Sequence, residues 1–281
     1  MKTPAFRGKV AAITGAGSGI GRALAQQLVA EGCAVAVADV DEVGLQGTVD
    51  SLGTAVRVTK RRVDVSRGDE LRAWAAEVAR EHGQVNLLFN NAGISYGATV
   101  AGADEDDFRR VVDVDFWGVV YGTRAFLPAL EASGDGHVVN VSSLFGLIGY
   151  PGQAAYNAAK FAVRGFTESL RMELELTGSC VTATCVHPGG VKTNIARATK
   201  VHPSLSALGV DASRASAEFE KMFRTTPEEA AEIILAGVRR NERRVLVGSD
   251  AKVLDLLQRW MPAAYQALVV SLGRRRAKGR A

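Results

Sequence analysis

The stretch KVAAITGAGSGIG, residues 9–21, joins a short apolar run to a cluster of glycines. Its first part predicts a buried strand, and the segment 19–30 carries apolar residues at helical spacing. A strand, a glycine-rich turn and a helix N-terminus together form an anion site, because free backbone N–H groups and the helix dipole face the anion. Glycine lets the backbone approach the anion without a Cβ. The spacing is GxxxGxG rather than the common GxGxxG (Gly15, Gly19, Gly21).

The rest of the chain repeats this alternation of short strands and longer helices. Six further β-rich runs fall at 34–40, 55–65, 85–90, 137–141, 180–186 and 244–247. Helical patterns lie near 67–82, 104–131, 153–176 and 227–239. Continuous apolar strands separated by helices indicate a parallel sheet that is covered on both faces. We therefore expect the α/β class, with a doubly wound, Rossmann-like parallel sheet of about seven strands and helices on both faces.

Length and composition fit one globular domain over residues 1–281. Hydrophobic residues make up 47% of the chain and charged residues 23%, which is too apolar for a disordered protein. An irregular stretch near 191–226 is typical of a lid over a site. An amphipathic helix is expected near 251–272, packed on the body or on another subunit rather than on a membrane. No uncharged apolar run reaches the roughly 18 residues of a membrane span, and no signal peptide is visible, so we expect a cytoplasmic protein without an integral membrane segment.

The net charge of +4 comes from the last nine residues, 273–281. These nine residues include five basic ones (Arg274, Arg275, Arg276, Lys278 and Arg280). Without these five, the chain has 29 basic and 30 acidic residues. We expect such a tail to stay solvated and disordered, with weak attachment to an anionic membrane or nucleic acid as the alternative. Because basic residues cluster only there, no nucleic-acid partner is expected. The three cysteines form no CxxC pair and the histidines are scattered, so no metal site is expected.

Two acidic residues at strand ends suggest how a nucleotide is bound. Asp39 ends the second strand, where a carboxylate accepts hydrogen bonds from an adenosine ribose and repels a 2′-phosphate. No basic residue follows at Val40, and Ser18 is not basic, which favours NAD over NADP. Asp64, with the neighbouring amide of Val65, is a candidate adenine contact. The alternative for either aspartate is a local role at the start of a helix.

Three further residues form a candidate catalytic group. Tyr156 and Lys160 are four residues apart in a helical segment, so they lie on one face about a turn apart. A phenol has a pKa of roughly 10 and is a poor base at neutral pH, but a nearby ammonium favours the phenolate. Ser143 follows the fifth strand, at the edge where such sheets bind ligands. It can therefore share a substrate oxygen with Tyr156.

With these residues the chain resembles the classical short-chain dehydrogenases/reductases. Order and spacing fit over roughly residues 7–250. The resemblance implies a single-domain Rossmann-like oxidoreductase that assembles as a homotetramer or homodimer through the long helices near 104–131 and 153–176. The matching motifs are TGAGSGIG at 14–21, Asp64, NNAG at 90–93, VNVSS at 139–143, YNAAK at 156–160 and PGGVKT at 188–193.

The resemblance also implies residue roles. Tyr156 would be the general acid/base, Ser143 would position the carbonyl, and Lys160 would lower the pKa of the tyrosine and hold the nicotinamide ribose. Residues 91–93 would line the adenosine ribose, and the segment after the sixth strand would contact the nicotinamide half and the phosphates. The remaining cofactor contacts implied are Gly15, Gly17, Ser18, Gly19, Ile20, Asn91, Ala92, Gly93, Pro188, Gly189, Val191 and Thr193.

One position departs from the family pattern. Most relatives have an asparagine in the helix after the fourth strand, and here Asp115 aligns with it. Aspartate has the same shape, but it cannot donate a hydrogen bond and can carry charge. A carboxylate near Lys160 would stabilise the ammonium and partly cancel its effect on Tyr156. We therefore expect activity with a shifted pH profile.

The expected substrate pocket has walls at 144–150, at 94–96 and in the lid. Leu144 and Tyr150 belong to a mostly apolar run, which indicates a hydrophobic substrate unless these side chains simply fill the core. The sequence thus predicts an NAD-dependent oxidoreductase that moves a hydride between the nicotinamide and a secondary alcohol or ketone. The alternatives are an NADP-dependent ketone reductase and a non-catalytic dinucleotide-binding scaffold.

Overall fold

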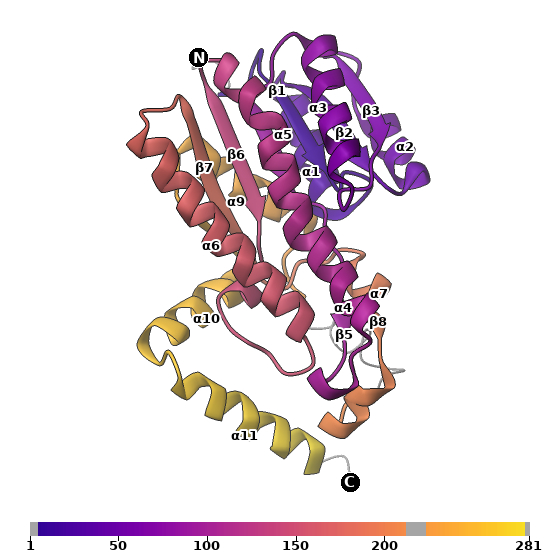
Figure 1. Ribbon diagram of the computed structural model, residues 1–281, viewed down its shortest axis with the longest axis vertical. Coiled ribbons are helices and arrows are strands. Elements are labelled where there is room, and N and C mark those ends of the chain that lie inside the picture. Colours follow the sequence, from indigo (N-terminus) through magenta and orange to yellow (C-terminus); the bar gives the residue numbers. More distant parts are fainter. Residues whose placement is uncertain (1–4, 212–222, 279–281) are drawn as a thin grey trace.

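A computed structural model of the chain describes residues 5–211 and 223–278. Seven strands form one parallel sheet in the order β3-β2-β1-β4-β6-β7-β9 (Figure 1). The sheet confirms the expected fold, although the third strand is shorter than 55–65 and the sixth continues to residue 188. The bounds are β1 (Val10–Thr14), β2 (Ala34–Asp39), β3 (Val58–Arg62), β4 (Leu87–Asn90), β6 (Gly136–Val141), β7 (Val181–Pro188) and β9 (Arg244–Val247).

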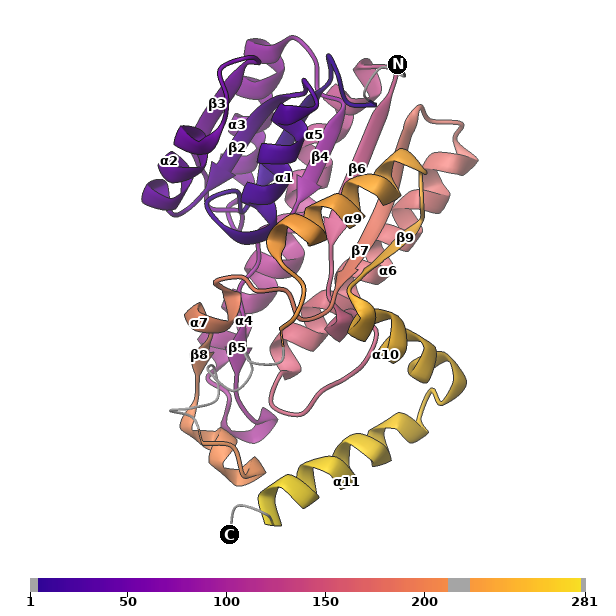
Figure 2. The same ribbon diagram turned by 180° about the vertical axis from the view of Figure 1, so that it is seen from behind.

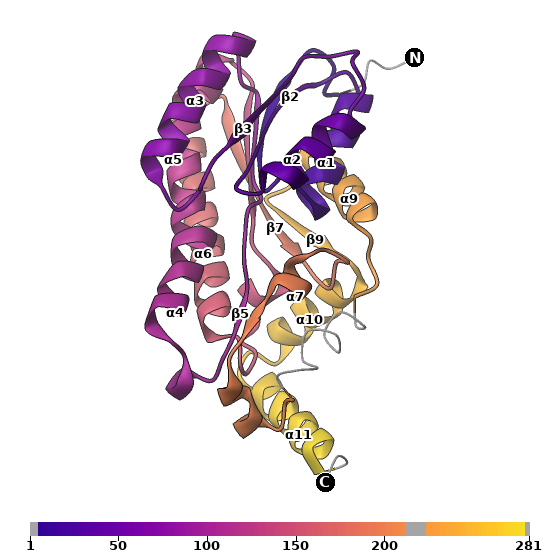
Figure 3. The ribbon, with the colours of Figure 1, turned by 90° about the vertical axis from the view of Figure 1, so that its right-hand side faces the viewer.

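Helices cover both faces of the sheet, as Figure 3 shows from the side. On β1, Ala11 and Ile13 pack into one apolar layer, whereas Val10 and Ala12 pack into the other. This double burial explains why apolar residues dominate the inner strands β1 and β4. One layer holds α1 (Gly19–Ala30), α2 (Glu42–Ser51) and α9 (Pro227–Arg239), and the other holds α3 (Gly68–His82), α5 (Gly118–Ala132) and α6 (Ala154–Leu176).

Helix α2 was not expected from the sequence. Its N-terminus is capped by Asp41, whose side chain accepts a hydrogen bond from the Gly44 amide at 3.0 Å. Two glycines in its ten residues hide the helical pattern. A Cβ at Gly44 would lie 2.9 Å from the carbonyl oxygen of Gly17, so this helix packs directly on the glycine-rich turn.

The helix expected over 104–131 contains a change of winding. It consists of α4 (Glu105–Val112), the π-helical turn η2 (Asp113–Trp117) and α5. The amide of Gly118 bonds to the carbonyl of Asp113, five residues earlier. Single π turns are common at functional sites, and Asp115 lies at the centre of this one.

Beyond the carboxyl ends of the strands the chain forms smaller elements. Strands β5 (Tyr96–Gly97) and β8 (Lys200–Val201) pair with each other. The segment predicted as a lid, 191–226, contains β8, α7 and η4, and its residues 212–222 lie outside the described part. The short helices are η1 (Val100–Gly102), η3 (Leu144–Gly146), α7 (Ile195–Ala198) and η4 (Pro203–Leu208).

The C-terminal segment forms two helices instead of the single one expected over 251–272. Helix α10 (Ser249–Trp260) and helix α11 (Ala264–Lys278) meet at an angle and extend away from the sheet (Figure 2). Pro262 explains the break, because proline lacks the N–H and disfavours helical geometry in the preceding residue. Helix α11 continues over 273–278, so the expectation of a disordered tail is wrong for these residues. Among the helices described, none has the length and apolarity needed to cross a membrane.

Candidate active site

A cavity of about 1260 Å³ lies at the carboxyl ends of the central strands. Such an edge is the usual ligand site of a doubly wound sheet, where the strand order reverses between β1 and β4. The cavity is lined by the glycine-rich turn and by Ser143, Tyr156 and Lys160. All residues named for the cofactor and the catalytic group line it except Gly17, whose amide bonds to Asp39, and Asp115, which is fully buried beside Lys160. Of the predicted pocket walls, residues 96, 146, 147 and 149 do not line the cavity.

The glycine-rich turn is shaped for close approach of a ligand. Gly15 has a φ of +66°, and a Cβ there would lie 2.7 Å from the Cα of Ala92. A Cβ at Gly21 would lie 2.2 Å from the carbonyl oxygen of Gly15. Ser18 precedes α1 without capping it through its side chain, and the first turn has no acidic residue. The N-terminal amides of α1 are thus not capped by Ser18 and fit the phosphates of a dinucleotide.

Asp39 holds the turn from the end of β2. Its carboxylate accepts hydrogen bonds from the amide of Gly17 at 2.8 Å and from the amide of Asp41 at 2.9 Å. The side chain is half-buried and reaches the cavity. Asp39 thus orders the backbone around the turn, and its negative charge lies where the cavity begins.

Asp64 makes local contacts at the start of α3. Its Oδ1 accepts hydrogen bonds from the amide of Ser66 at 3.0 Å and from the Ser66 hydroxyl at 2.7 Å. These bonds correspond to the alternative of a helix-opening residue. Asp64 and Val65 nevertheless line the cavity.

The segment 91–93 is fixed against the glycine turn by a residue that the sequence analysis did not single out. The Thr14 hydroxyl accepts hydrogen bonds from the amides of Asn91, at 3.0 Å, and Ala92, at 3.1 Å. The Asn91 side-chain amide donates to the carbonyls of Thr14 and Gly15. Gly93 packs closely against the candidate catalytic group, since a Cβ there would lie 3.3 Å from the Lys160 ammonium.

The loop after β7 covers the glycine turn. A Cβ at Gly19 would lie 3.0 Å from the Thr193 side chain, so the two segments touch. Asp250, at the start of α10, accepts a hydrogen bond from the Gly190 amide at 2.6 Å. Sequence analysis missed Asp250, because it follows Gly190 by 60 residues and no motif marks it. Pro188, Gly189, Val191 and Thr193 all line the cavity.

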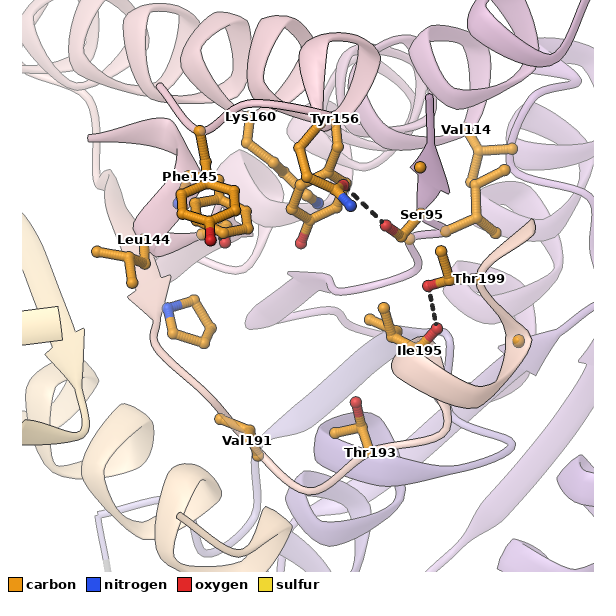
Figure 4. A pocket seen from close by; sticks show the side chains of 18 of the residues that line it. Ser95, Val114, Leu144, Phe145, Tyr156, Lys160, Val191, Thr193, Ile195 and Thr199 are labelled. Atoms are coloured by element: carbon orange, nitrogen blue, oxygen red, sulfur yellow. Dashed lines mark hydrogen bonds between the residues drawn. The ribbon is translucent and has the colours of Figure 1, made fainter. Parts of the chain in front are cut away.

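Tyr156 and Lys160 lie one turn apart on α6, as their spacing predicted. The Lys160 ammonium lies 5.5 Å from the centre of the tyrosine ring and donates a hydrogen bond to the Val141 carbonyl at 3.1 Å. The Ser143 side chain is close enough to Tyr156 to act to lower the pKa of its phenol. Figure 4 shows Tyr156 and Lys160 together in the pocket, with Leu144 and Phe145 beside them.

Asp115 forms a buried ion pair with Lys160. Its Oδ2 lies 3.2 Å from the ammonium, and both side chains are almost fully buried, with 0% and 3% exposure. Its Oδ1 accepts a hydrogen bond from the Ile94 amide at 2.8 Å. The carboxylate is thus bound between the lysine and the loop after β4. The structure confirms the expected proximity of Asp115 to Lys160.

These contacts set the protonation of the group. Burial raises the pKa of Tyr156, Lys160 opposes this rise, and Asp115 adds to it. Burial acts to lower the pKa of Lys160, but Asp115 and Tyr156 outweigh it, so that pKa is raised and the ammonium persists. Burial also raises the pKa of Asp115, against the pull of Lys160. The lysine therefore favours the phenolate as predicted, but the net pKa of Tyr156 is raised in this structure.

Apolar side chains surround the tyrosine on the substrate side. Phe145 stacks on Tyr150, with ring centres 5.4 Å apart, and meets Tyr156 edge-on at 6.2 Å. Leu144 is 9% exposed and Tyr150 38%. Across the pocket, Figure 4 shows Ile195, Val191 and Thr193 facing this group. Ser95 donates a hydrogen bond to Gln153 at 3.2 Å, a polar pair that the sequence analysis did not identify.

Comparison with known sequences identifies related proteins over the whole of this architecture. The family described as short chain dehydrogenase matches residues 9–203. The chain is 50% identical over 270 residues to a putative oxidoreductase, SadH, of Mycobacterium tuberculosis, covering 95% of each chain. It is 32% identical to a probable oxidoreductase, EphD, of Mycobacterium bovis, covering 93% of this chain and 45% of that protein.

Solved structures of related proteins share the fold of this chain. A short chain dehydrogenase/reductase from Burkholderia phymatum, in complex with NAD, has a TM-score of 0.84 and 32% identity, covering 91% of this chain and 94% of the other. Levodione reductase has a TM-score of 0.76 and 26% identity, covering 89% of this chain and 98% of the other.

Proposed function

The chain belongs to the short-chain dehydrogenase family, and on that premise we propose that it is an NAD-dependent oxidoreductase acting on an apolar secondary alcohol or ketone, with Tyr156 as general acid/base. The convergence of Ser143, Tyr156 and Lys160 in the same cavity as the glycine turn is the observation that supports this proposal best. A dinucleotide-binding scaffold would have no need of these three side chains together.

Each residue of the group has a defined part in the proposed reaction. NAD⁺, when bound, supplies the hydride acceptor for alcohol oxidation. Tyr156 takes the hydroxyl proton of the alcohol, and the Ser143 hydroxyl holds the same oxygen. The Lys160 ammonium stabilises the phenolate through its charge, and Asp115 keeps the ammonium in place and tempers that effect. In the direction of ketone reduction, Tyr156 returns the proton.

The residues present fit the proposed cofactor. The glycine turn and the amides of α1 would hold the phosphates, and Asp39 would accept hydrogen bonds from the adenosine ribose. Residues 91–93 and the loop containing Pro188 and Thr193 would line its remaining length. The negative charge of Asp39 supports NAD over NADP, and the related Burkholderia structure was solved with NAD. Tighter binding of NADP⁺ than NAD⁺ in a direct titration would overturn this choice.

A subunit contact is also proposed. The π turn before α5 leaves Trp117 41% exposed, and α6 leaves Phe161, Met172 and Leu176 exposed by 41–87%. These apolar side chains support pairing of copies through the two long helical segments as a dimer or tetramer. The three cysteines are unpaired, which supports action in a reducing compartment such as the cytoplasm.

The experiment that tests the proposed function is a screen of secondary alcohols and ketones followed by NADH absorbance. The wild type and Tyr156→Phe are compared. Phenylalanine keeps the ring and removes the proton-transferring hydroxyl, so we expect turnover to fall by about a hundredfold or more, while NAD⁺ affinity stays nearly unchanged. Equal turnover by the two proteins would refute the role of Tyr156.

A further inference from the structure

The C-terminal helices leave large apolar side chains exposed. On α10, Val253, Leu256 and Trp260 are 65%, 56% and 80% exposed. Their spacing of three and four residues places them in one stripe. The opposite side of α10 buries Ala251, and Leu254 packs beside η3. The exposed stripe is therefore not the core face of the helix.

Helix α11 also combines a buried side with exposed apolar side chains. Tyr265 anchors it, because its hydroxyl accepts a hydrogen bond from the Gly149 amide at 2.9 Å and its ring is buried. Leu268, Val270 and Leu272 are each 44–50% exposed. The two helices thus present a mostly exposed apolar surface, which we call the C-terminal surface (Val253, Leu256, Trp260, Met261, Leu268 and Val270).

The sequence around and after this surface is rich in basic residues. No acidic residue follows Asp255, whereas six basic residues do (Arg259, Arg274, Arg275, Arg276, Lys278 and Arg280). The rest of the chain is nearly neutral. Exposed tryptophan and leucine next to a basic cluster are typical of helices that lie in a membrane interface, with apolar side chains at the acyl boundary and basic ones at anionic headgroups.

We propose that the C-terminal surface docks the protein on a bilayer containing anionic phospholipid. A second copy of the chain fits this surface less well, because a twofold contact would bring two strongly basic segments together. Nucleic acid would use the basic residues but would leave the apolar stripe of α10 unpartnered. An anionic bilayer satisfies both features at once.

The same helices also line the cavity. Leu254 of α10 and Val269 and Leu272 of α11 belong to its wall. Docking would therefore place the apolar side of the cavity next to the membrane, so that an apolar alcohol or ketone can enter from the lipid. This consequence rests on the proposed function, whereas the docking itself does not.

Vesicle sedimentation tests the docking without any turnover. The full chain is mixed with phosphatidylcholine vesicles that contain or lack phosphatidylglycerol, at low and high salt. We expect binding to the anionic vesicles and a strong decrease with salt. In a Trp117→Phe background, the fluorescence of Trp260 should shift to the blue on binding, because Trp74 is already buried. Equal binding to neutral and anionic vesicles, or none, would overturn the proposal.

Variants separate the apolar from the charged contribution. Leu256→Ser and Trp260→Ser should each weaken binding by about tenfold. Replacing Arg274, Arg275 and Arg276 together by glutamine should weaken it by about a hundredfold. Val43→Ser is the matched control, since Val43 is 84% exposed on α2, outside the C-terminal surface and outside the proposed subunit contact.

Neither Leu256 nor Trp260 lines the cavity, so turnover of a small water-soluble alcohol should not change in these variants. Equal loss of binding in the control would refute the proposal. So would sedimentation velocity showing that Leu256→Ser dissociates a larger assembly while vesicle binding persists.

Discussion

Replacement of Asp115 by asparagine tests the electrostatics of the candidate site directly. Asparagine keeps the shape and can still accept the Ile94 amide, but it removes the charge. Because Asp115 raises the pKa of Tyr156, its loss should lower that pKa. The variant should therefore oxidise alcohols at lower pH than the wild type.

The structure gives the size of this shift. The carboxylate lies 3.2 Å from the Lys160 ammonium, which lies 5.5 Å from the tyrosine ring centre. The charge is therefore at most about 9 Å from the ring, where an effective dielectric constant of about 20 gives roughly 2 kcal/mol. At 1.36 kcal/mol per pKa unit, the midpoint should move by about one to one and a half pH units toward acid.

The assay is kcat/KM for alcohol oxidation as a function of pH, with NADH absorbance as the signal. Glu105→Gln is the control, because it removes one acidic charge from the same helical segment at a side chain that is 84% exposed. Its profile should match that of the wild type. An unchanged profile for Asp115→Asn, or an equal shift in the control, would refute the electrostatic role of Asp115.

Three other predictions concern stability and cofactor choice. Gly122→Ala should lower the free energy of unfolding by about 1–3 kcal/mol in thermal denaturation, because the new Cβ would lie 2.2 Å from the buried Asn90 Oδ1. Gly165→Ala is the control and should cause no such loss, because there is open space around Gly165. Burial lowers the pKa of both His137 and His187 to about 4, so only the unfolded chain takes up their protons as the pH falls below 6.5. Denaturant titrations should therefore show that the free energy of unfolding falls between pH 6.5 and 4, by about 2 kcal/mol for each histidine at pH 5. In His137→Gln the fall at pH 5 should be smaller by about 2 kcal/mol, the contribution of that histidine. Asp39→Ala should narrow the preference for NAD⁺ over NADP⁺, measured by titration, because the charge that repels a 2′-phosphate is gone.

The parts of the fold that could be predicted are those that follow from burial. The first four residues of β1 are apolar because both faces of the strand are covered, and the other strands of the sheet repeat this pattern to different degrees. Helix α2 escaped prediction because Gly44 is required by a tertiary contact with the glycine turn, which no local pattern reveals. The break at Pro262 could have been predicted from proline chemistry alone.

Prediction of the candidate site had a similar limit. Motif spacing placed Ser143, Tyr156 and Lys160 in one cavity, and alignment placed Asp115 beside the lysine. Thr14 and Asp250 were missed because their contributions are hydrogen bonds to distant backbone amides. The raised pKa of Tyr156 could not be predicted either, since it depends on how completely the ring is enclosed.

The π turn before α5 changes the spacing of buried residues in the sequence. Side chains facing inward recur at Val111, Asp115, Val119, Thr123, Phe126 and Leu130. From the first to the last of these are five turns and 19 steps along the chain, one more than the roughly 18 steps that five regular α-helical turns require. That single surplus residue rotates everything after it by about 100°, and its deletion would restore regular winding while turning the carboxylate away from its lysine. One extra residue in the helical spacing of buried positions is therefore a sequence pattern with which a buried acidic residue of this kind can be sought in other chains.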